Sequence, residues 1–114
     1  MLSPALLEKL LQFRRERDWE QFHTPRNLSA AICVEAAELL DHFRWARDAD
    51  QQEMPAQQRT DMEHEVADIA ILLSYFCHDL GIDLETAVQR KLELNGTRYP
   101  VHKSRGSSNK YDSL

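Results

Sequence analysis

Four acidic residues stand in the sequence as two matched pairs, Glu35 with Glu38 and Glu65 with Asp68. The members of each pair are three positions apart, so on an α-helix their carboxylates lie on one face, one turn apart. At about 100° per residue, each pair also falls on the apolar stripe of its helix, the face that should point toward the core. The apolar residues that share these arcs are Leu28, Ala31, Ile32 and Leu39 beside the first pair, and Ile69, Leu72 and Phe76 beside the second.

Acids on core-facing arcs need a partner of opposite charge. Clustered carboxylates repel one another and lose hydration, at a cost of several kcal/mol per ion unless something compensates. Mg²⁺ compensates well, because it prefers carboxylate oxygens, keeps several waters and recruits substrate phosphates. We therefore predict that Glu35, Glu38, Glu65 and Asp68 hold Mg²⁺. The alternative is a solvated acidic face, which is common for a single E-x-x-E but less favoured for two pairs on core-facing arcs.

A second set of polar residues lies on the last expected helix. Lys91, Asn95 and Arg98 share its inward arc. An ammonium, an amide and a guanidinium in that register can reach phosphate oxygens. The alternative is that Lys91 and Arg98 neutralise the C-terminal end of the helix or extend to solvent. Because the acidic pairs are present, we favour phosphate binding.

A short loop over residues 19–23 combines two aromatic rings, an amide and an imidazole. Trp45 lies at the edge of the arc that carries the first acidic pair. Trp19 and Trp45 could sandwich a planar base while Gln21, His23 or backbone groups contact its edge. The alternative, that both tryptophans are core or interface aromatics, is equally compatible with the sequence.

Four expected helices position these residues. Ser3 and Pro4 form an N-cap followed by proline, a pattern that begins a helix running toward Asp18. Gly81 should end the third helix, and Asp83 should cap the fourth. We expect helices over residues 4–18, about 28–45, about 55–80 and 83–97, a loop over 18–26 ending in a Thr-Pro break, a connector over 47–55 and a polar basic tail over 103–114.

Length and composition fit one all-α, four-helix bundle-like domain over residues 1–102, followed by the tail. The chain has 114 residues, 42% of them hydrophobic, and three Gly and four Pro are too few for a turn-rich β architecture. A domain of this size gains stability from association, so we expect a homo-oligomer. The net charge of −5 opposes binding to a nucleic acid backbone.

The sequence gives no indication of export or membrane insertion. We find no signal peptide and no apolar run that could span a bilayer. Cys33 and Cys77 fall on apolar stretches without C-x-x-C spacing, so we expect two buried free thiols in a reducing cytoplasm. Glycine-rich phosphate loops are also absent, which excludes the P-loop and Rossmann classes. We therefore expect a soluble cytoplasmic protein that binds neither membranes nor nucleic acid.

The spacing of the acids resembles that of a known family. E-x-x-E, followed after 26 residues by E-x-x-D, is similar to the signature of the MazG-like all-α nucleoside triphosphate pyrophosphohydrolases. Further segments resemble the dCTP pyrophosphatase branch of that family. They are residues 17–23, 25–28, 43–45, 98–100 and 108–111, within a resemblance that runs from about residue 7 to residue 114.

The resemblance implies an enzyme that cleaves a nucleoside triphosphate between its α and β phosphates, with Mg²⁺ held by the four acids. It implies a pyrimidine substrate, with dCTP or a modified dCTP favoured, and hence a role in nucleotide-pool sanitation. It also implies sites built between the subunits of a dimer or, more favoured in this branch, a tetramer. The residues that it assigns to the base are Trp45 and the loop residues Trp19, Glu20, Gln21, Phe22 and His23.

The chemistry expected at the acids is metal-assisted hydrolysis. Glu38 is our candidate for the general base that activates water, while the other acids remain metal ligands. Relatives in the branch have Tyr at the position of Leu72 and His at the position of Leu10, so we expect weaker discrimination among bases here. Two alternatives remain open: a pyrophosphohydrolase of broad NTP specificity, and a non-catalytic helical oligomeric interaction module.

Overall fold

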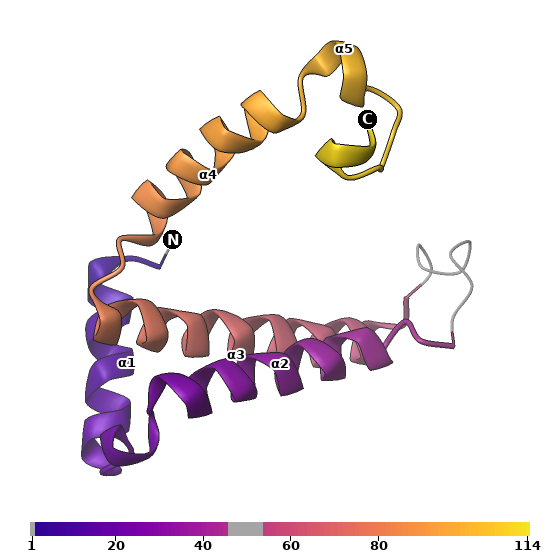
Figure 1. Ribbon diagram of the computed structural model, residues 1–114. Coiled ribbons are helices and arrows are strands. Elements are labelled where there is room, and N and C mark those ends of the chain that lie inside the picture. Colours follow the sequence, from indigo (N-terminus) through magenta and orange to yellow (C-terminus); the bar gives the residue numbers. More distant parts are fainter. Residues whose placement is uncertain (1, 46–53) are drawn as a thin grey trace. The chain divides into compact units, whose positions relative to one another are not determined.

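The computed structural model describes residues 2–45 and 54–114, which divide into two compact units, residues 2–81 and residues 82–114. All elements in these residues are helical (Figure 1), which confirms the predicted all-α class. None of the described helices is both long enough and apolar enough to cross a membrane. Most of the expected connector over 47–55 lies outside the described residues.

The first helix, α1 (Pro4–Glu16), begins as predicted. The Ser3 hydroxyl oxygen accepts a hydrogen bond from the Leu6 N–H at 3.2 Å, and proline occupies the first helical position. After the helix, Asp18 adopts a left-handed backbone conformation with φ 54°. Aspartate tolerates this region better than most residues other than glycine. The turn leads into a single 3₁₀ turn, η1 (Glu20–Phe22), within the expected loop.

The second helix, α2 (Pro25–Asp41), begins and ends earlier than the predicted range of 28–45. The Thr-Pro pair that we interpreted as a break is instead the start of this helix. The Thr24 hydroxyl oxygen accepts a hydrogen bond from the Asn27 N–H at 3.1 Å. A threonine N-cap followed by proline begins a helix well, because the N–H that proline lacks would have no intrahelical partner there. Residues 42–45 form a turn rather than the last turn of the helix.

The next two helices, α3 (Ala56–Leu80) and α4 (Leu84–Arg98), confirm the predicted boundaries closely. Gly81 follows α3 with φ 66°, and so supplies the left-handed residue expected after a helix. The Asp83 carboxylate accepts a hydrogen bond from the Thr86 N–H at 3.1 Å and caps α4.

The unit of residues 82–114 continues beyond α4 with two short elements, α5 (Val101–Ser104) and η3 (Tyr111–Ser113). The short helix α5 crosses the expected boundary between a domain over 1–102 and a tail over 103–114. That division remains a prediction.

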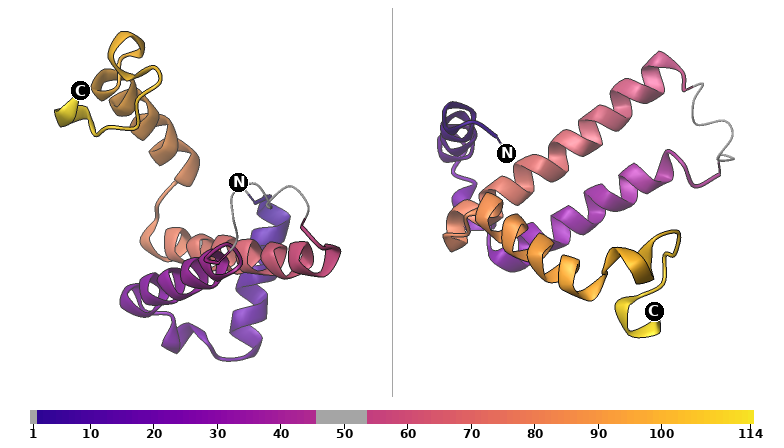
Figure 2. Two further views of the ribbon diagram at one scale, coloured as in Figure 1. Left: turned by 90° about the vertical axis from the view of Figure 1, so that its right-hand side faces the viewer. Right: turned by 90° about the horizontal axis from the view of Figure 1, so that it is seen from above.

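In the unit of residues 2–81, α2 packs antiparallel along α3, and α1 crosses the C-terminal part of α3 (Figure 1, Figure 2). Its buried apolar residues are Leu28, Tyr75 and Cys77. The burial of Cys77 was predicted, but Cys33 is exposed, so that part of the prediction was wrong. Cys33 lies on the face of α2 opposite the arc that carries Leu28 and Glu35, and therefore points away from α3.

An ion pair joins α1 to the last turns of α3. Arg14 Nη1 donates to Asp79 Oδ2 at 2.9 Å, and Arg14 Nη2 donates to Asp79 Oδ1. The guanidinium also lies 4.6 Å from the centroid of the Tyr75 ring, and the Tyr75 hydroxyl donates to the Leu10 carbonyl at 2.6 Å. Arg14 is only 5% exposed, and its hydrogen bonds hold the pKa of the Asp79 carboxyl below its usual value. The ion pair and the Tyr75 hydrogen bond are therefore both polar links between the two helices.

We predict that Asp79→Asn destabilises the fold and reduces its sensitivity to acid. The substitution leaves the buried Arg14 guanidinium without a charged partner, at an expected cost of about 1–3 kcal/mol because Asp79 itself is partly exposed. Since pairing lowers the folded-state pKa of Asp79, its contribution is present above the ordinary value of about 4 and is lost as pH falls through the lower folded value. Urea unfolding followed by circular dichroism at pH 7 and pH 3 should show a wild-type advantage that shrinks at pH 3.

The matched control is Glu8→Gln, which removes an exposed ion pair between Glu8 and Arg15 on the same helix, with an N···O distance of 3.6 Å. Exposed pairs contribute about 0–1 kcal/mol, so we expect little change in the free energy of unfolding. Equal losses in the two variants, or a loss in Asp79→Asn that does not change with pH, would contradict the prediction.

Candidate metal centre and adjoining pocket

Three of the four predicted metal ligands come together where α2 packs along α3. Glu35, Glu38 and Glu65 each offer a carboxylate oxygen, and these three atoms lie within 4.8 Å of one another. Glu35 and Glu65 are half-buried, as their place on the inward arcs predicts, whereas Glu38 and Asp68 are exposed. Asp68 lies one turn after Glu65 and lines the same cavity as Glu35. The arrangement is the consequence of i,i+3 spacing on two antiparallel helices.

The half-buried Glu35 is the acid of this cluster whose negative charge is most disfavoured. Its Oε2 atom is enclosed and has no hydrogen-bond partner among the described residues. Burial, then the neighbouring carboxyls of Glu38 and Glu65, and finally the charge of Asp68 raise the pKa of Glu35 to about 7. A proton or a cation would relieve this strain, and oxygen ligands of this kind suit Mg²⁺. The acid set therefore fits a divalent metal ion.

A histidine that the sequence analysis did not select lies beside this cluster. His42 Nε2 is 3.7 Å from Glu65 Oε1, and both side chains are about one-fifth exposed (18% and 20%). The Gln58 side-chain amide donates to the His42 carbonyl at 3.0 Å and holds the turn after α2 against α3. His42 follows Glu35 by seven positions, two helical turns, and this spacing was a usable signal.

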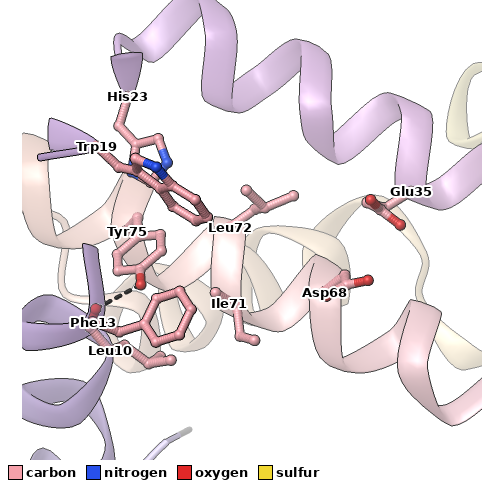
Figure 3. A pocket seen from close by; sticks show the side chains of 9 residues that line it. All are labelled: Leu10, Phe13, Trp19, His23, Glu35, Asp68, Ile71, Leu72 and Tyr75. Carbon is pink, nitrogen blue, oxygen red and sulfur yellow. Dashed lines mark hydrogen bonds between the residues drawn. The ribbon is translucent and has the colours of Figure 1, made fainter. Parts of the chain in front are cut away.

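A cavity of about 400 Å³ opens next to the acids (Figure 3). Glu35 and Asp68 lie on one side of it, and the aromatic side chains lie on the other. All of its lining residues belong to the unit of residues 2–81. They are Leu10 and Phe13 of α1, Trp19 and His23 of the loop, Glu35 of α2, and Asp68, Ile71, Leu72 and Tyr75 of α3.

The aromatic end of this cavity is a cluster of rings in edge-on and tilted contact. The Trp19 ring meets Phe13 with centroids 5.7 Å apart and planes at 74°, and it meets His23 at 6.5 Å and 61°. The His23 ring lies 5.1 Å from Tyr75. Trp19 remains partly exposed and lines the cavity, so part of its side chain is accessible to a ligand.

The surroundings of His23 favour the neutral form of its imidazole. Burial and the positive charge of Arg14 lower its pKa, and the more weakly acting Asp79 opposes them. Arg14 Nη1 lies 3.4 Å from His23 Nδ1. Since His23 lines the cavity while Arg14 is buried behind it, the two residues connect the cavity wall to the ion pair between α1 and α3.

Four residues predicted to contact the base are not among those that line this cavity. Gln21 donates its amide to the Asp18 carboxylate at 2.9 Å and to the Asp18 carbonyl at 3.0 Å, so it holds the loop itself. The Phe22 ring is largely exposed, and Glu20 lines a separate shallow cavity of about 140 Å³ beside Arg14. The fourth, Trp45, is 86% exposed. Roles for these four residues in binding remain predictions.

The predicted phosphate ligands Lys91, Asn95 and Arg98 lie on α4, in the unit of residues 82–114. Within that unit the Arg98 guanidinium lies 4.7 Å from the centroid of the Tyr111 ring, so the last residues of the chain pack on the end of α4. Tyr111 also meets Tyr99 edge-on at 6.0 Å. Contact of the three polar residues with phosphate remains a prediction.

Sequence reasoning missed three residues of the cavity wall, namely Phe13, Ile71 and Tyr75. Ile71 and Tyr75 follow Asp68 by three and seven positions, so extending the inward arc of the second acidic pair would have found them. Phe13 carries no such signal, because it belongs to α1 and reaches the cavity only through the crossing of α1 and α3.

The chain is similar to several known proteins. A model of the MazG-like family matches residues 30–114. The dCTP pyrophosphatase 1 of Mus musculus is 43% identical over 105 residues, which cover 90% of this chain and 62% of the relative, and the Homo sapiens protein of the same name is 40% identical. The chain thus spans about three-fifths of the length of these curated relatives.

A solved structure agrees with the sequence matches. The crystal structure of a pyrophosphatase from Archaeoglobus fulgidus has a TM-score of 0.78 and 40% identity to this chain, with 84% of this chain and 90% of that chain covered. The family model covers most of the chain, including both acidic pairs. The chain therefore belongs to the MazG-like family.

Proposed function

We propose that the protein hydrolyses a nucleoside triphosphate between its α and β phosphates, in a reaction that depends on Mg²⁺. The observation that carries this proposal is the two-ended cavity, with Glu35 and Asp68 at one end and Trp19 and His23 at the other. A nucleotide has the matching chemistry, because its phosphates need a cation and its base needs an aromatic surface. The activities named for the relatives support the same reaction.

Glu35, Glu65 and Asp68 would hold the metal ion, and Glu38, the fourth predicted ligand, lies beside Glu35 and Glu65. When bound, Mg²⁺ would neutralise charge on the phosphate oxygens and lower the pKa of nearby water. Glu38 is the proposed general base, because its exposed carboxylate is open to water while Glu35 is enclosed. Glu38 accepts a proton from the attacking water, the α–β anhydride bond breaks, and the monophosphate and pyrophosphate are released.

The aromatic end is proposed to hold a pyrimidine, with dCTP or a modified dCTP favoured. The volume of about 400 Å³ lies within the range of small-molecule sites, roughly 300–1,000 Å³. Trp19 would stack on the base, and Trp45, Glu20, Gln21 and Phe22 are the other residues proposed to contact it. Lys91, Asn95 and Arg98 of α4 are the proposed phosphate ligands.

Broad NTP specificity is the second candidate, and one observation favours it. Leu10 and Leu72, where the related branch has polar residues, both line the cavity. Apolar walls bind many bases without requiring a particular set of polar atoms, so selection by hydrogen bonding is expected to be weaker here.

The activity is tested by incubating dCTP with the protein and Mg²⁺ and separating the products by chromatography. We expect dCMP and pyrophosphate, and we expect EDTA to stop the reaction until Mg²⁺ is restored. Glu38→Gln should lower kcat by about 10²- to 10⁴-fold because it removes the general base. The control is Glu63→Gln, an exposed acid of α3 paired with Arg59, which should leave kcat unchanged.

Three results would contradict parts of this prediction. Absence of any hydrolysis would favour the non-catalytic helical module, and formation of dCDP and phosphate would place the cleaved bond elsewhere. A Glu38→Gln variant with wild-type kcat would leave the site in place but remove Glu38 as the base.

We predict that Glu35→Gln stabilises the metal-free protein while it weakens metal binding. The raised pKa of Glu35 means that folding disfavours its charge, so stability falls as pH rises from the ordinary Glu value of about 4.3 through about 7. At pH 8 in EDTA a neutral glutamine removes this repulsion, and we expect the Tm to rise by a few degrees. Added Mg²⁺ should raise the Tm of wild type but not of the variant.

The comparison variant is Glu63→Gln, whose Tm in EDTA should match that of wild type at every pH. If Glu35→Gln lowers the Tm at pH 8, or if Mg²⁺ stabilises both proteins equally, Glu35 is not the strained metal ligand proposed.

We also predict a homo-oligomer, with a tetramer favoured over a dimer. Val34 and Leu40 of α2, Val66 of α3 and Leu92 of α4 are each more than half exposed. Apolar side chains of this size gain stability when a second copy covers them. Light scattering at micromolar concentration should give a mass above that of one chain, and Leu40→Glu should lower it. A well-folded wild-type monomer would refute the prediction.

A further inference from the structure

The two ring nitrogens of His23 have different surroundings. His23 Nδ1 faces Arg14 Nη1 at 3.4 Å, and the ring lines the cavity. A guanidinium can only donate hydrogen bonds, so Nδ1 must be the acceptor in this contact. A neutral imidazole that accepts at Nδ1 carries its proton on Nε2. His23 therefore carries its N–H donor on Nε2, the ring nitrogen that Arg14 does not contact.

Arg14 is held in this position from several sides. Its two terminal nitrogens donate to the two Asp79 carboxylate oxygens, and its guanidinium lies 4.6 Å from the Tyr75 ring centroid. The Arg14 carbonyl accepts the Trp19 N–H at 2.9 Å. A bidentate pair of this kind restricts the orientation of the guanidinium, so the contact with His23 Nδ1 persists without a ligand.

We propose that the Arg14–Asp79 pair is a positioning device that fixes the tautomer of His23, so that the cavity offers an N–H donor to an acceptor atom on the edge of the base. Neither Arg14 nor Asp79 lines the cavity, so both act through His23 and not by contact with substrate. The inference deepens the proposed function and rests on its placement of the base at the aromatic end.

The other side chains at the aromatic end of the cavity also favour a ligand whose edge accepts hydrogen bonds. The Tyr75 hydroxyl proton is already committed to the Leu10 carbonyl, and the Trp19 indole nitrogen can only donate. The remaining residues there have no side-chain polar atoms: they are Leu10, Phe13, Ile71 and Leu72. The free polar groups are thus mainly N–H donors. They match a carbonyl oxygen or an unprotonated ring nitrogen of a pyrimidine such as cytosine.

The direct test is ¹H–¹⁵N NMR of the His23 ring in the full chain. In wild type we expect one neutral tautomer, with the proton on Nε2. The double variant Arg14→Met, Asp79→Leu removes the pair without leaving a buried charge, which favours retention of the fold. In this variant we expect both tautomers in exchange and titration of His23 at a higher pH. The groups that face the ring are Arg14, which lowers its pKa, Asp79, which raises it less, and Tyr75, whose hydroxyl is bound elsewhere.

The kinetic test uses the same variant with dCTP. Loss of one well-placed hydrogen bond to the base should raise KM by about tenfold and leave kcat nearly unchanged, because the contact is equal in the ground and transition states. The matched control is Glu8→Gln with Arg15→Gln, an exposed pair on α1, which should change neither the NMR spectrum of His23 nor KM. If the double variant does not fold, Arg14→Met alone removes the donor to His23 Nδ1 and leaves only the partly exposed Asp79 carboxylate unpaired, with the same expected exchange of tautomers.

The outcomes separate this inference from the proposed function. A wild-type proton on Nδ1, or an unchanged tautomer and titration in the double variant, overturns the assignment of the Arg14–Asp79 pair. A fall in kcat with unchanged KM also overturns it. A single Nε2–H tautomer in a protein that does not hydrolyse dCTP supports the positioning role and overturns only the proposed function.

Discussion

The ion pair between Arg14 and Asp79 is the interaction on which the aromatic half of the cavity depends. It joins α1 to α3 at the point where the two helices cross, and the Arg14 backbone also accepts the hydrogen bond that starts the following loop at Trp19. The pair therefore helps to hold Phe13 of α1 opposite the part of the cavity wall that α3 contributes. A buried pair of this kind adds little net stability compared with apolar packing, but it specifies one orientation of the two helices. The shape of the cavity requires that orientation.

The acid cluster, in contrast, lowers the stability of the helix pair that contains it. Glu35 and Glu65 occupy inward positions between α2 and α3 that a leucine would fill with a gain in stability. Their mutual repulsion weakens the same helix pair that brings them together. Proteins commonly accept this conflict at functional sites, where the groups needed for chemistry are not those that pack best. A bound cation would remove the conflict, because it would replace repulsion across the helix pair with attraction to both sides.

Sequence periodicity predicted which residues share a face of one helix, but it predicted few of the contacts between residues of different helices. The shared faces of Glu35 with Glu38 and of Glu65 with Asp68 follow from helical spacing alone, and the structure brings three of these four acids together. The start of α2 was misplaced because a Thr-Pro pair is compatible with both a break and an N-cap, and only the Asn27 hydrogen bond distinguishes them. The wall of the cavity depends on the angle at which α1 crosses α3, which no local pattern records.

The left-handed backbone of Asp18, between α1 and η1, helps to order the loop that carries Trp19 and His23. Asp18 reverses the chain at φ 54°, and its carboxylate and carbonyl both accept from the Gln21 amide. The Asn27 amide closes the far side by donating to the Phe22 carbonyl at 3.0 Å. The segment that carries Trp19 and His23 is therefore ordered as the chain folds, so a ligand does not have to restrict its backbone on arrival. Binding free energy that a flexible loop would lose to conformational entropy remains available as affinity.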